Sequence, residues 1–268
     1  MRHREALREG FLDSSIAIVV TLGILAVTGG LLVLLEPARP SVTSMSSTPP
    51  STGARSIDPG AFGSGTLGPW QDLLKHISSD DEIQDALAFN GVFMFGDSIA
   101  VQDRAALETL LRNRTGEALA VHDWSGQPTS AAVDALADWE RRFGLPSRIV
   151  MAVGSNDIFD PPAFAAQVER ALQIAGPTRT VFWVNVYVGR VRQPAEIRAA
   201  DESNSAWINQ QLEQAAVRHP NLRIIRWAEF LAGQPGGPAS YLRDGIHTSH
   251  PVGTNARNEL ILQAILDR

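Results

Sequence analysis

The chain has 268 residues, a formal net charge of −6 and 44% hydrophobic residues, a balance typical of a globular protein with a substantial core. It contains no cysteine, so disulfides, thiolate catalysis and cysteine-based zinc sites are excluded. It also has no basic cluster interleaved with aromatic residues, and nucleic acid is therefore not expected as a partner.

The first predicted element is a membrane-spanning helix over residues 14–35, a stretch of 22 residues without a charge. At a rise of about 1.5 Å per residue this helix would be about 33 Å long, enough for a hydrocarbon core of about 30 Å. Because Arg2, Arg4 and Arg8 precede it, residues 1–13 are expected in the cytoplasm and the rest outside the bacterial cytoplasmic membrane. A cleaved signal peptide is the alternative, although its apolar region usually has about 7–15 residues.

Residues 36–69 are rich in Pro, Ser, Thr and Gly and contain few large apolar residues. Such a segment buries too little surface to offset its ordering entropy, and it is predicted to be a flexible linker. Gly63, Gly65 and Gly68 match the spacing G-x-G-x-x-G of dinucleotide-binding loops. That motif needs a strand before it and a helix after it, whereas this one lies in a linker and ends at Pro69. A nucleotide site is therefore not expected.

Residues 70–268 are predicted to form one α/β domain. Residues 71–89 have the pattern of one or two short amphipathic helices, and apolar runs then alternate with helical patterns. The predicted strands are 92–96, 118–122, 148–153, 180–188 and 222–227, and the predicted helices are 99–113, 129–143, 161–175, 201–218 and 254–267. This alternation predicts a parallel sheet covered by helices on both faces, with ligands bound beyond the carboxyl ends of the strands.

Polar residues follow four of the predicted strands. Ser98 follows the first strand, Gly126 the second and Asn156 the third. Asp244 and His247 lie in one loop between the fifth strand and the last helix. Because the carboxyl ends of parallel strands meet at one edge of the sheet, these five residues are expected to lie close together.

Their chemistry is that of nucleophilic catalysis. A serine such as Ser98 needs a base within hydrogen-bonding distance, and His247 is the candidate for that base. Asp244 would hold the other ring nitrogen and stabilise the imidazolium. The backbone N–H groups of Ser98 and Gly126 and the side-chain amide of Asn156 would form an oxyanion hole.

The motifs that contain these residues also resemble a known family. "FGDS" with Ser98, "WSGQ" with Gly126, "GSND" with Asn156 and "DGIH" with Asp244 and His247 are similar to the four sequence blocks of SGNH (GDSL-type) hydrolases. This resemblance covers roughly residues 90–268. It implies a three-layer α/β/α flavodoxin-like fold, the same assignment of nucleophile, base, partner acid and oxyanion donors, no metal and no cofactor.

A narrower resemblance lies in the second half of the domain. "VFWVNVYVGR" (181–190) and "NSAWINQQLEQAAVRHPNLRIIRWAEF" (204–230) are similar to the SGNH domains fused to bacterial membrane O-acyltransferases that modify cell-envelope polymers. This chain has a single predicted anchor in place of their multi-helix membrane domain. The resemblance therefore suggests a separate membrane acyltransferase as a candidate partner.

The sequence thus predicts a membrane-anchored, extracytoplasmic serine esterase that acts on acyl esters of an envelope glycan, a lipid or a small metabolite. Two alternatives stay open: an O-acyltransferase of a cell-envelope polysaccharide with the same triad, and an inactive envelope-binding module. Arg190, in the loop after the fourth strand, and Trp124, after the second, are further candidates for substrate contact. The competing interpretations are a solvated loop arginine and a packed aromatic residue.

Overall fold

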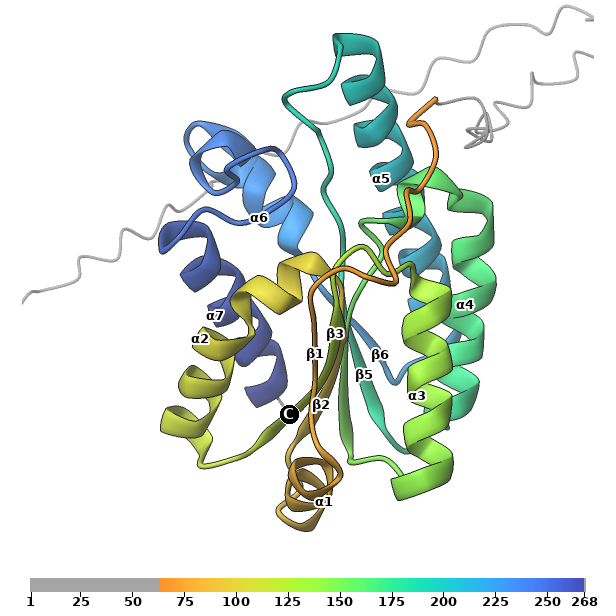
Figure 1. Ribbon diagram of the computed structural model, residues 1–268, viewed down its shortest axis with the longest axis vertical. Coiled ribbons are helices and arrows are strands. Elements are labelled where there is room, and N and C mark those ends of the chain that lie inside the picture. Colours follow the sequence, from red (N-terminus) through yellow and green to blue (C-terminus); the bar gives the residue numbers. More distant parts are fainter. Residues whose placement is uncertain (1–62, 268) are drawn as a thin grey trace, which may run out of the picture. The chain divides into compact units, whose positions relative to one another are not determined.

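The computed structural model describes residues 63–267. These residues form an α/β/α domain in which helices cover both faces of a central sheet (Figure 1). The predicted anchor, residues 14–35, and the linker up to residue 62 lie outside the described range. Within residues 63–267, no helix is both long and apolar enough to cross a membrane.

The sheet has six strands in the order β1-β3-β2-β4-β5-β6. Their bounds are Lys75–Ile77 for β1, Val92–Gly96 for β2, Leu119–Trp124 for β3, Arg148–Ala152 for β4, Thr180–Val184 for β5 and Leu222–Ile225 for β6. Strands β2 to β6 run parallel, as expected, whereas β1 pairs antiparallel with β3 at the edge. The sheet is therefore mixed: its central strands are parallel as predicted, and the antiparallel edge strand β1 was not predicted.

Residues 63–267 contain seven α-helices. Their bounds are Asp80–Ala88 for α1, Ser98–Thr115 for α2, Thr129–Phe143 for α3, Pro161–Ala175 for α4, Ala195–Arg218 for α5, Trp227–Gly233 for α6 and Val252–Leu266 for α7. Helices α1 to α5 connect successive strands, and α6 and α7 follow β6. Helices α3, α4 and α5 lie on one side of the sheet, and α2, α6 and α7 lie on the other (Figure 1). The helices predicted over 129–143 and 161–175 have the observed bounds, and α5 begins earlier than predicted.

The strands supply two hydrophobic cores because successive side chains of a strand point to opposite faces. In β2, Phe93 and Phe95 are buried in the core beneath α3, α4 and α5. Val92 and Met94 of the same strand are buried in the core beneath α2 and α7. A strand buried on both faces has no polar alternation, which is why β2 is a continuous apolar run in the sequence.

One predicted strand is shorter in the structure than the sequence suggested. The strand predicted over 180–188 ends at Val184, and the backbone N–H groups of Val186 and Val188 instead donate to the side chains of Asn209 and Ser205 on α5. These two hydrogen bonds hold residues 186–188 against α5 and away from the sheet. Residues 185–194 therefore form a loop at the carboxyl edge of the sheet.

Within residues 71–89 the prediction of helices alone was wrong. Residues 75–77 form β1 because the outer edge of β3 is open to pairing, with Lys75 opposite Trp124. Helix α1 begins only after Ser79, whose hydroxyl accepts from the Glu82 N–H while the Glu82 carboxylate accepts from the Ser79 N–H. This capping box fixes the boundary between strand and helix.

The last residues of the predicted flexible linker, 63–69, have no regular secondary structure but contact the domain. Ser64 is buried, its carbonyl oxygen accepts from Arg190 at 2.6 Å, and its hydroxyl accepts from Asn204 at 2.8 Å. Arg190 in turn forms an ion pair with Asp201 of α5, at 2.6 Å between Nη2 and Oδ1. The chain is therefore attached to the domain before Trp70, the first residue of the predicted domain.

Removal of one partner of the ion pair between Arg190 and Asp201 is expected to be strongly destabilising, because the Asp201 side chain is 0% exposed and that of Arg190 is 20% exposed. Asp201→Ala leaves a largely buried guanidinium without its partner. The expected loss of unfolding free energy is at the lower end of about 3–5 kcal/mol, measured by urea denaturation.

Asp134→Ala is the matched control, because it also removes a helical aspartate paired with an arginine, here Arg170, but both side chains are exposed at 67% and 43%. Its expected cost is below about 1 kcal/mol. Equal losses in the two variants would contradict the structural role of the buried pair.

Candidate active site

The loop between β2 and α2 presents Ser98 at the first position of a helix. Asp97 is the N-cap of α2, and its Oδ1 accepts from the backbone N–H of Ile99 at 2.9 Å. Its other oxygen accepts from the Ser155 hydroxyl, and its own N–H donates to Ala152 of β4 at 3.2 Å. The buried Asp97 therefore shapes the loop, while Ser98 remains partly exposed.

Ser98, His247 and Asp244 form a continuous chain of hydrogen bonds. Ser98 Oγ lies 2.9 Å from His247 Nε2, and His247 Nδ1 lies 2.9 Å from Asp244 Oδ2. With the Nδ1 proton donated to the carboxylate, Nε2 is left as the acceptor for the serine hydroxyl. The sequence placed these three residues at one edge of the sheet, and the structure joins them.

Asp244 is held as an ionised group by its own loop. Its Oδ1 accepts from the backbone N–H groups of Ile246 at 3.0 Å and His247 at 2.8 Å. Partial burial alone would raise the pKa of Asp244, but the hydrogen bonds from His247 and Ile246 and the charge of His247 outweigh it and lower that pKa. The carboxylate therefore stays charged at neutral pH and orients the imidazole.

The loop that carries His247 is fixed to the helix that begins with Ser98. Asp103 of α2 is buried and accepts from the hydroxyl of Thr248 at 2.8 and 3.0 Å and from that of Thr254 at 2.9 Å. Gln102 donates to the Thr248 carbonyl oxygen at 3.0 Å. These contacts set the position of His247 relative to the serine.

Asp103 is not among the site residues predicted from the sequence. The signal was present, because Asp103 lies on the same helical face as Ala100, Leu107 and Leu111, all of which are buried. An acidic residue within an apolar helical stripe needs a partner, and here the partners come from residues 248 and 254.

The segment that follows β5 supports the same loop through two further hydrogen bonds. The Gly189 N–H donates to the Gly245 carbonyl oxygen at 2.9 Å, and the Val191 N–H donates to the Asp244 carbonyl oxygen at 3.1 Å. Gly245 has a φ of +87°, and a Cβ there would collide with the Gly189 carbonyl oxygen. A glycine is therefore required between Asp244 and His247.

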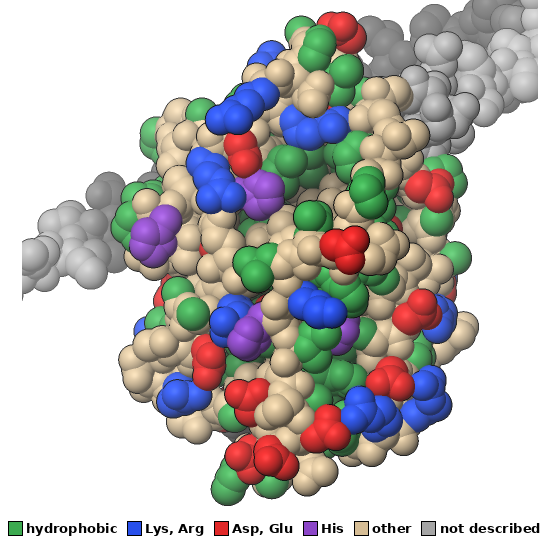
Figure 2. Space-filling view, in the orientation of Figure 1, with side chains coloured by type: hydrophobic (Ala, Val, Ile, Leu, Met, Phe, Trp, Pro, Cys, Tyr) green, Lys and Arg blue, Asp and Glu red, His purple; other side chains and the backbone are tan. Residues whose placement is uncertain are grey.

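Gly126 lies in the same cavity as Ser98 and His247, which has a volume of about 560 Å³. Its φ is +76°, and a Cβ there would lie 2.8 Å from the Cβ of Trp70. The other residues that line this cavity are Leu73, Leu74, Val101, Gln102, Ser125 and Arg243. On the face of the domain drawn in Figure 2, histidine and basic side chains lie beside apolar ones.

Asn156 follows β4, and its side-chain amide is oriented by the neighbouring loop. Its Nδ2 donates to the Gln127 carbonyl oxygen at 3.1 Å, which uses one of the two amide hydrogens. Gln127 follows Gly126, and its own side chain donates to the carbonyl oxygen of Gly96. The loops after β2, β3 and β4 are therefore interlocked around Ser98.

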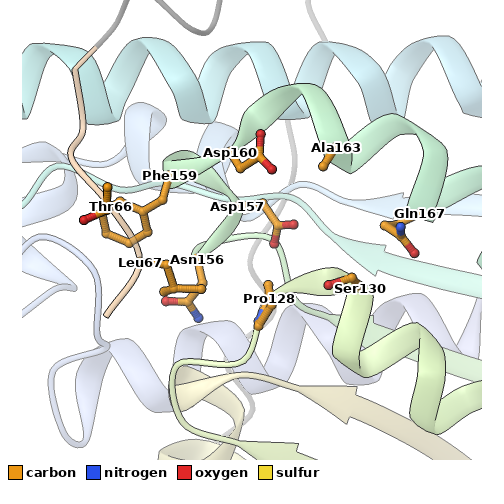
Figure 3. Close-up of a pocket in the computed structure, with 10 residues that line it drawn as sticks. All are labelled: Thr66, Leu67, Pro128, Ser130, Asn156, Asp157, Phe159, Asp160, Ala163 and Gln167. Carbon is orange, nitrogen blue, oxygen red and sulfur yellow. The ribbon is translucent and has the colours of Figure 1, made fainter. Parts of the chain in front are cut away.

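Asn156 also lines a second cavity, of about 340 Å³, between residues 66–67, the beginning of α3 and the beginning of α4 (Figure 3). Asp157 lies at the centre of this view, in a 3-10 turn over Asp157–Phe159. Its carboxylate accepts from the backbone N–H of Thr129 at 3.0 Å and from the Thr129 hydroxyl at 2.7 Å. Asp157 thereby attaches this turn to the beginning of α3.

Three buried aspartate side chains lie at the edge of the sheet where the parallel strands end. Burial raises the pKa of Asp157 to about 7, although the hydrogen bonds from Thr129 oppose the shift. Burial also raises the pKa of Asp97, and burial together with the charge of Asp97 raises that of Asp123 well above its ordinary value. Neither oxygen of Asp123 has a hydrogen-bond partner, which is consistent with a neutral carboxyl group.

The raised pKa of Asp157 predicts a pH-dependent stability. Between pH 4 and about 7 the folded state holds a proton that the unfolded chain releases, so the free energy of unfolding falls as pH rises through this range. Asp157→Asn removes this titration and keeps an acceptor for Thr129. Urea denaturation at pH 5 and pH 8 should show a decline smaller by up to about 2–3 kcal/mol in the variant than in the wild type.

Asp97 and Asp123 titrate in the same direction, so the variant is expected to retain part of the decline. An identical pH dependence in the variant and the wild type would contradict the raised pKa of Asp157.

The two predicted substrate contacts have structural partners. The Arg190 guanidinium makes a bidentate contact with Asp201, with its Nε 2.7 Å from Oδ2 and its Nη2 2.6 Å from Oδ1. The Trp124 ring meets the edge of Trp70 at a centroid distance of 5.0 Å, and the Lys75 ammonium lies 4.3 Å from its centroid. The structure thus shows an ion pair for Arg190 and aromatic and cation contacts for Trp124, and contact with substrate stays a prediction for both. Among the described residues, no cluster of three or more His, Cys, Asp or Glu side chains could hold a metal ion.

No protein-family model matches the chain, and neither does any curated protein. Its fold matches the C-terminal catalytic domain of Streptococcus pneumoniae peptidoglycan O-acetyltransferase A, with 21% identity and a TM-score of 0.50 over 66% of this chain and 90% of that one. It also matches a GDSL-like lipase from Bacteroides thetaiotaomicron, with 16% identity and a TM-score of 0.54 over 71% and 91% of the two chains.

A third similar structure is an acetyl xylan esterase, with 17% identity and a TM-score of 0.50 over 65% of this chain and 99% of that one. At these identities the similarity is one of fold. The described domain has the fold of the SGNH (GDSL-type) hydrolases, as the sequence motifs suggested.

Proposed function

We propose that this protein is a serine esterase that hydrolyses ester-linked acyl groups through an acyl-enzyme on Ser98. The observation that carries the proposal is the hydrogen-bonded chain of Ser98, His247 and Asp244, with both links at 2.9 Å. The cavity of about 560 Å³ above Ser98 leaves room for an ester. The similar folds of a lipase and an acetyl xylan esterase agree with this chemistry.

In the first step, His247 Nε2 accepts the proton of the Ser98 hydroxyl as Oγ attacks the ester carbonyl carbon. The tetrahedral intermediate then collapses, the bond from the carbonyl carbon to the alkoxy oxygen breaks, and His247 donates the proton to the leaving alcohol. Water attacks the acyl-enzyme with His247 again as the base, which releases the acid and restores Ser98. The ionised Asp244 stabilises the imidazolium in both steps.

Three donors are proposed for the oxyanion. The Ser98 N–H lies at the N-terminus of α2, where the helix dipole favours negative charge. The Gly126 N–H belongs to the loop that interlocks with the serine loop, and Asn156 has a second amide hydrogen beyond the one that it donates to Gln127. Fixed donors of this kind stabilise the transition state without reorganisation.

An O-acyltransferase of a cell-envelope polysaccharide is the second candidate. The similar fold of a peptidoglycan O-acetyltransferase catalytic domain favours it. A sugar hydroxyl would then attack the acyl-enzyme in place of water, and a membrane acyltransferase would supply the acyl group. Product analysis with and without an added glycan acceptor separates transfer from hydrolysis.

A catalytically inactive envelope-binding module is the third candidate. Binding alone does not require a serine hydroxyl 2.9 Å from a histidine whose other nitrogen is held by a carboxylate. The intact hydrogen-bonded chain therefore supports the enzymatic candidates over this one.

Ser98→Ala and His247→Ala are each expected to lower kcat for p-nitrophenyl acetate by roughly 10³–10⁶-fold, because a nucleophile and its base act as one unit. For the same reason the double variant should be scarcely slower than either single variant. His250→Ala is the matched control, since His250 lies in the same loop but is exposed. A His247→Ala protein with near wild-type turnover would contradict the assignment of the base.

We also place the enzyme on the outer face of a bacterial cytoplasmic membrane, anchored by residues 14–35. This rests on the uncharged stretch and the arginines before it. The substrate would then be an ester of an envelope glycan or lipid, or a small metabolite outside the cell.

Protease added to intact spheroplasts should therefore release the catalytic domain, while an N-terminal epitope tag stays protected. A full-length protein that resists protease in intact spheroplasts but is cut after lysis would contradict the extracytoplasmic location. Soluble active protein beginning near residue 36 would instead indicate signal cleavage.

A further inference from the structure

The segment before β1 forms one wall of the cavity that contains Ser98. The backbone N–H of Ser125 donates to the Leu74 carbonyl oxygen at 2.9 Å, and the Leu73 N–H donates to the Trp70 carbonyl oxygen at 2.9 Å. Trp70 packs edge-on against Trp124 at a centroid distance of 5.0 Å. Residues 70–74 are therefore fixed beside the carboxyl end of β3.

This wall presents two large apolar side chains to solvent. Leu73 is 48% exposed and Leu74 is 71% exposed, and both line the cavity shared by Ser98 and His247. Val101, one helical turn after the serine in α2, lines the same cavity. Exposed apolar side chains are common singly, but a group of them beside a candidate nucleophile indicates a binding surface.

We infer that Leu73, Leu74 and Val101 form the contact surface for the acyl chain of the substrate, and that the enzyme prefers acyl chains longer than acetyl. The inference rests on the proposed esterase function and deepens it. In an ester of a sugar or another polar alcohol, the acyl chain is the apolar part. Its natural contacts are therefore the apolar side chains of the cavity.

One polar lining residue suits the other half of the substrate. Arg243 lines the same cavity and offers hydrogen-bond donors to a polar alcohol, whereas the Gln102 amide already donates to Thr248. A cavity of about 560 Å³ is much larger than the methyl group of an acetyl ester needs. Burying one further methylene group against the leucines is worth about a fourfold gain in binding.

The test compares kcat/KM for p-nitrophenyl acetate, butyrate and hexanoate, because the leaving group is then constant and only the acyl chain varies. For the wild-type full-length chain, kcat/KM should rise from acetate to hexanoate. Leu74→Ala should lower the hexanoate value by about 3–10-fold and change the acetate value by less than about twofold. Leu74→Met, which keeps an apolar side chain of similar volume, should restore most of the hexanoate activity.

Phe89→Ala is the matched control. Phe89 is 74% exposed and ends α1, at the opposite end of β2 from Ser98. The substitution removes an apolar side chain that is about as exposed as Leu74 but lies away from the cavity. The dependence of kcat/KM on acyl-chain length in this variant should equal that of the wild type. Because Leu74 is mostly exposed, its substitution by alanine leaves the core intact.

Three results would overturn the inference while leaving the esterase function in place. They are a wild-type preference for acetate, an unchanged hexanoate value in Leu74→Ala, and an equal loss on acetate and hexanoate, which would assign Leu74 to the leaving group. Absence of turnover on all three esters would instead overturn the proposed function, and the inference with it.

Discussion

The buried carboxylate of Asp103 holds the two halves of the candidate active site together. Ser98 and His247 are 149 residues apart in sequence, and they meet because Asp103 binds Thr248 and Thr254 to the helix that begins with Ser98. A buried carboxylate without partners would be costly, so the loop hydroxyls that satisfy it are strongly constrained. The serine–histidine distance is thus set by a contact with the residue next to His247.

The loops after β2, β3 and β4 are also held together by hydrogen bonds between buried or partly buried polar groups. Each loop contributes one proposed oxyanion donor, and each is hydrogen-bonded to another of the three through Gln127 and Ser155. The strands beneath these loops pair with Gly96 of β2 opposite Asp123 of β3 and Ala152 of β4. This register sets where the three loops begin. Preorganisation of this kind is what stabilises developing charge in a transition state.

Much of this site could be predicted from the sequence. The central strands are long apolar runs, and the rule that parallel strands end at one edge places Ser98, Gly126, Asn156, Asp244 and His247 together. The structure joins Ser98, His247 and Asp244 by hydrogen bonds and places Gly126 in the same cavity. Asn156 lies on the adjoining loop, bonded to Gln127.

The edge strand and the surroundings of the site could not be predicted in this way. A three-residue strand such as β1 is too short for a hydrophobic period, and it forms only because β3 has an open edge. The partner of Arg190 is Asp201, 11 residues later in the chain, and nothing in the pattern of either segment signals that the loop folds back onto α5 to form this pair. The leucines of the cavity wall lie in the segment predicted as helix, so their place beside Ser98 depended on the pairing of β1.

The most direct test of the account is the site of covalent modification by a fluorophosphonate, a reagent that labels activated serines. After reaction of the full-length protein, peptide mass spectrometry should find the adduct on Ser98, and His247→Ala should form it far more slowly. The absence of an adduct, or an adduct on another serine such as Ser125, would contradict the claim that His247 activates Ser98.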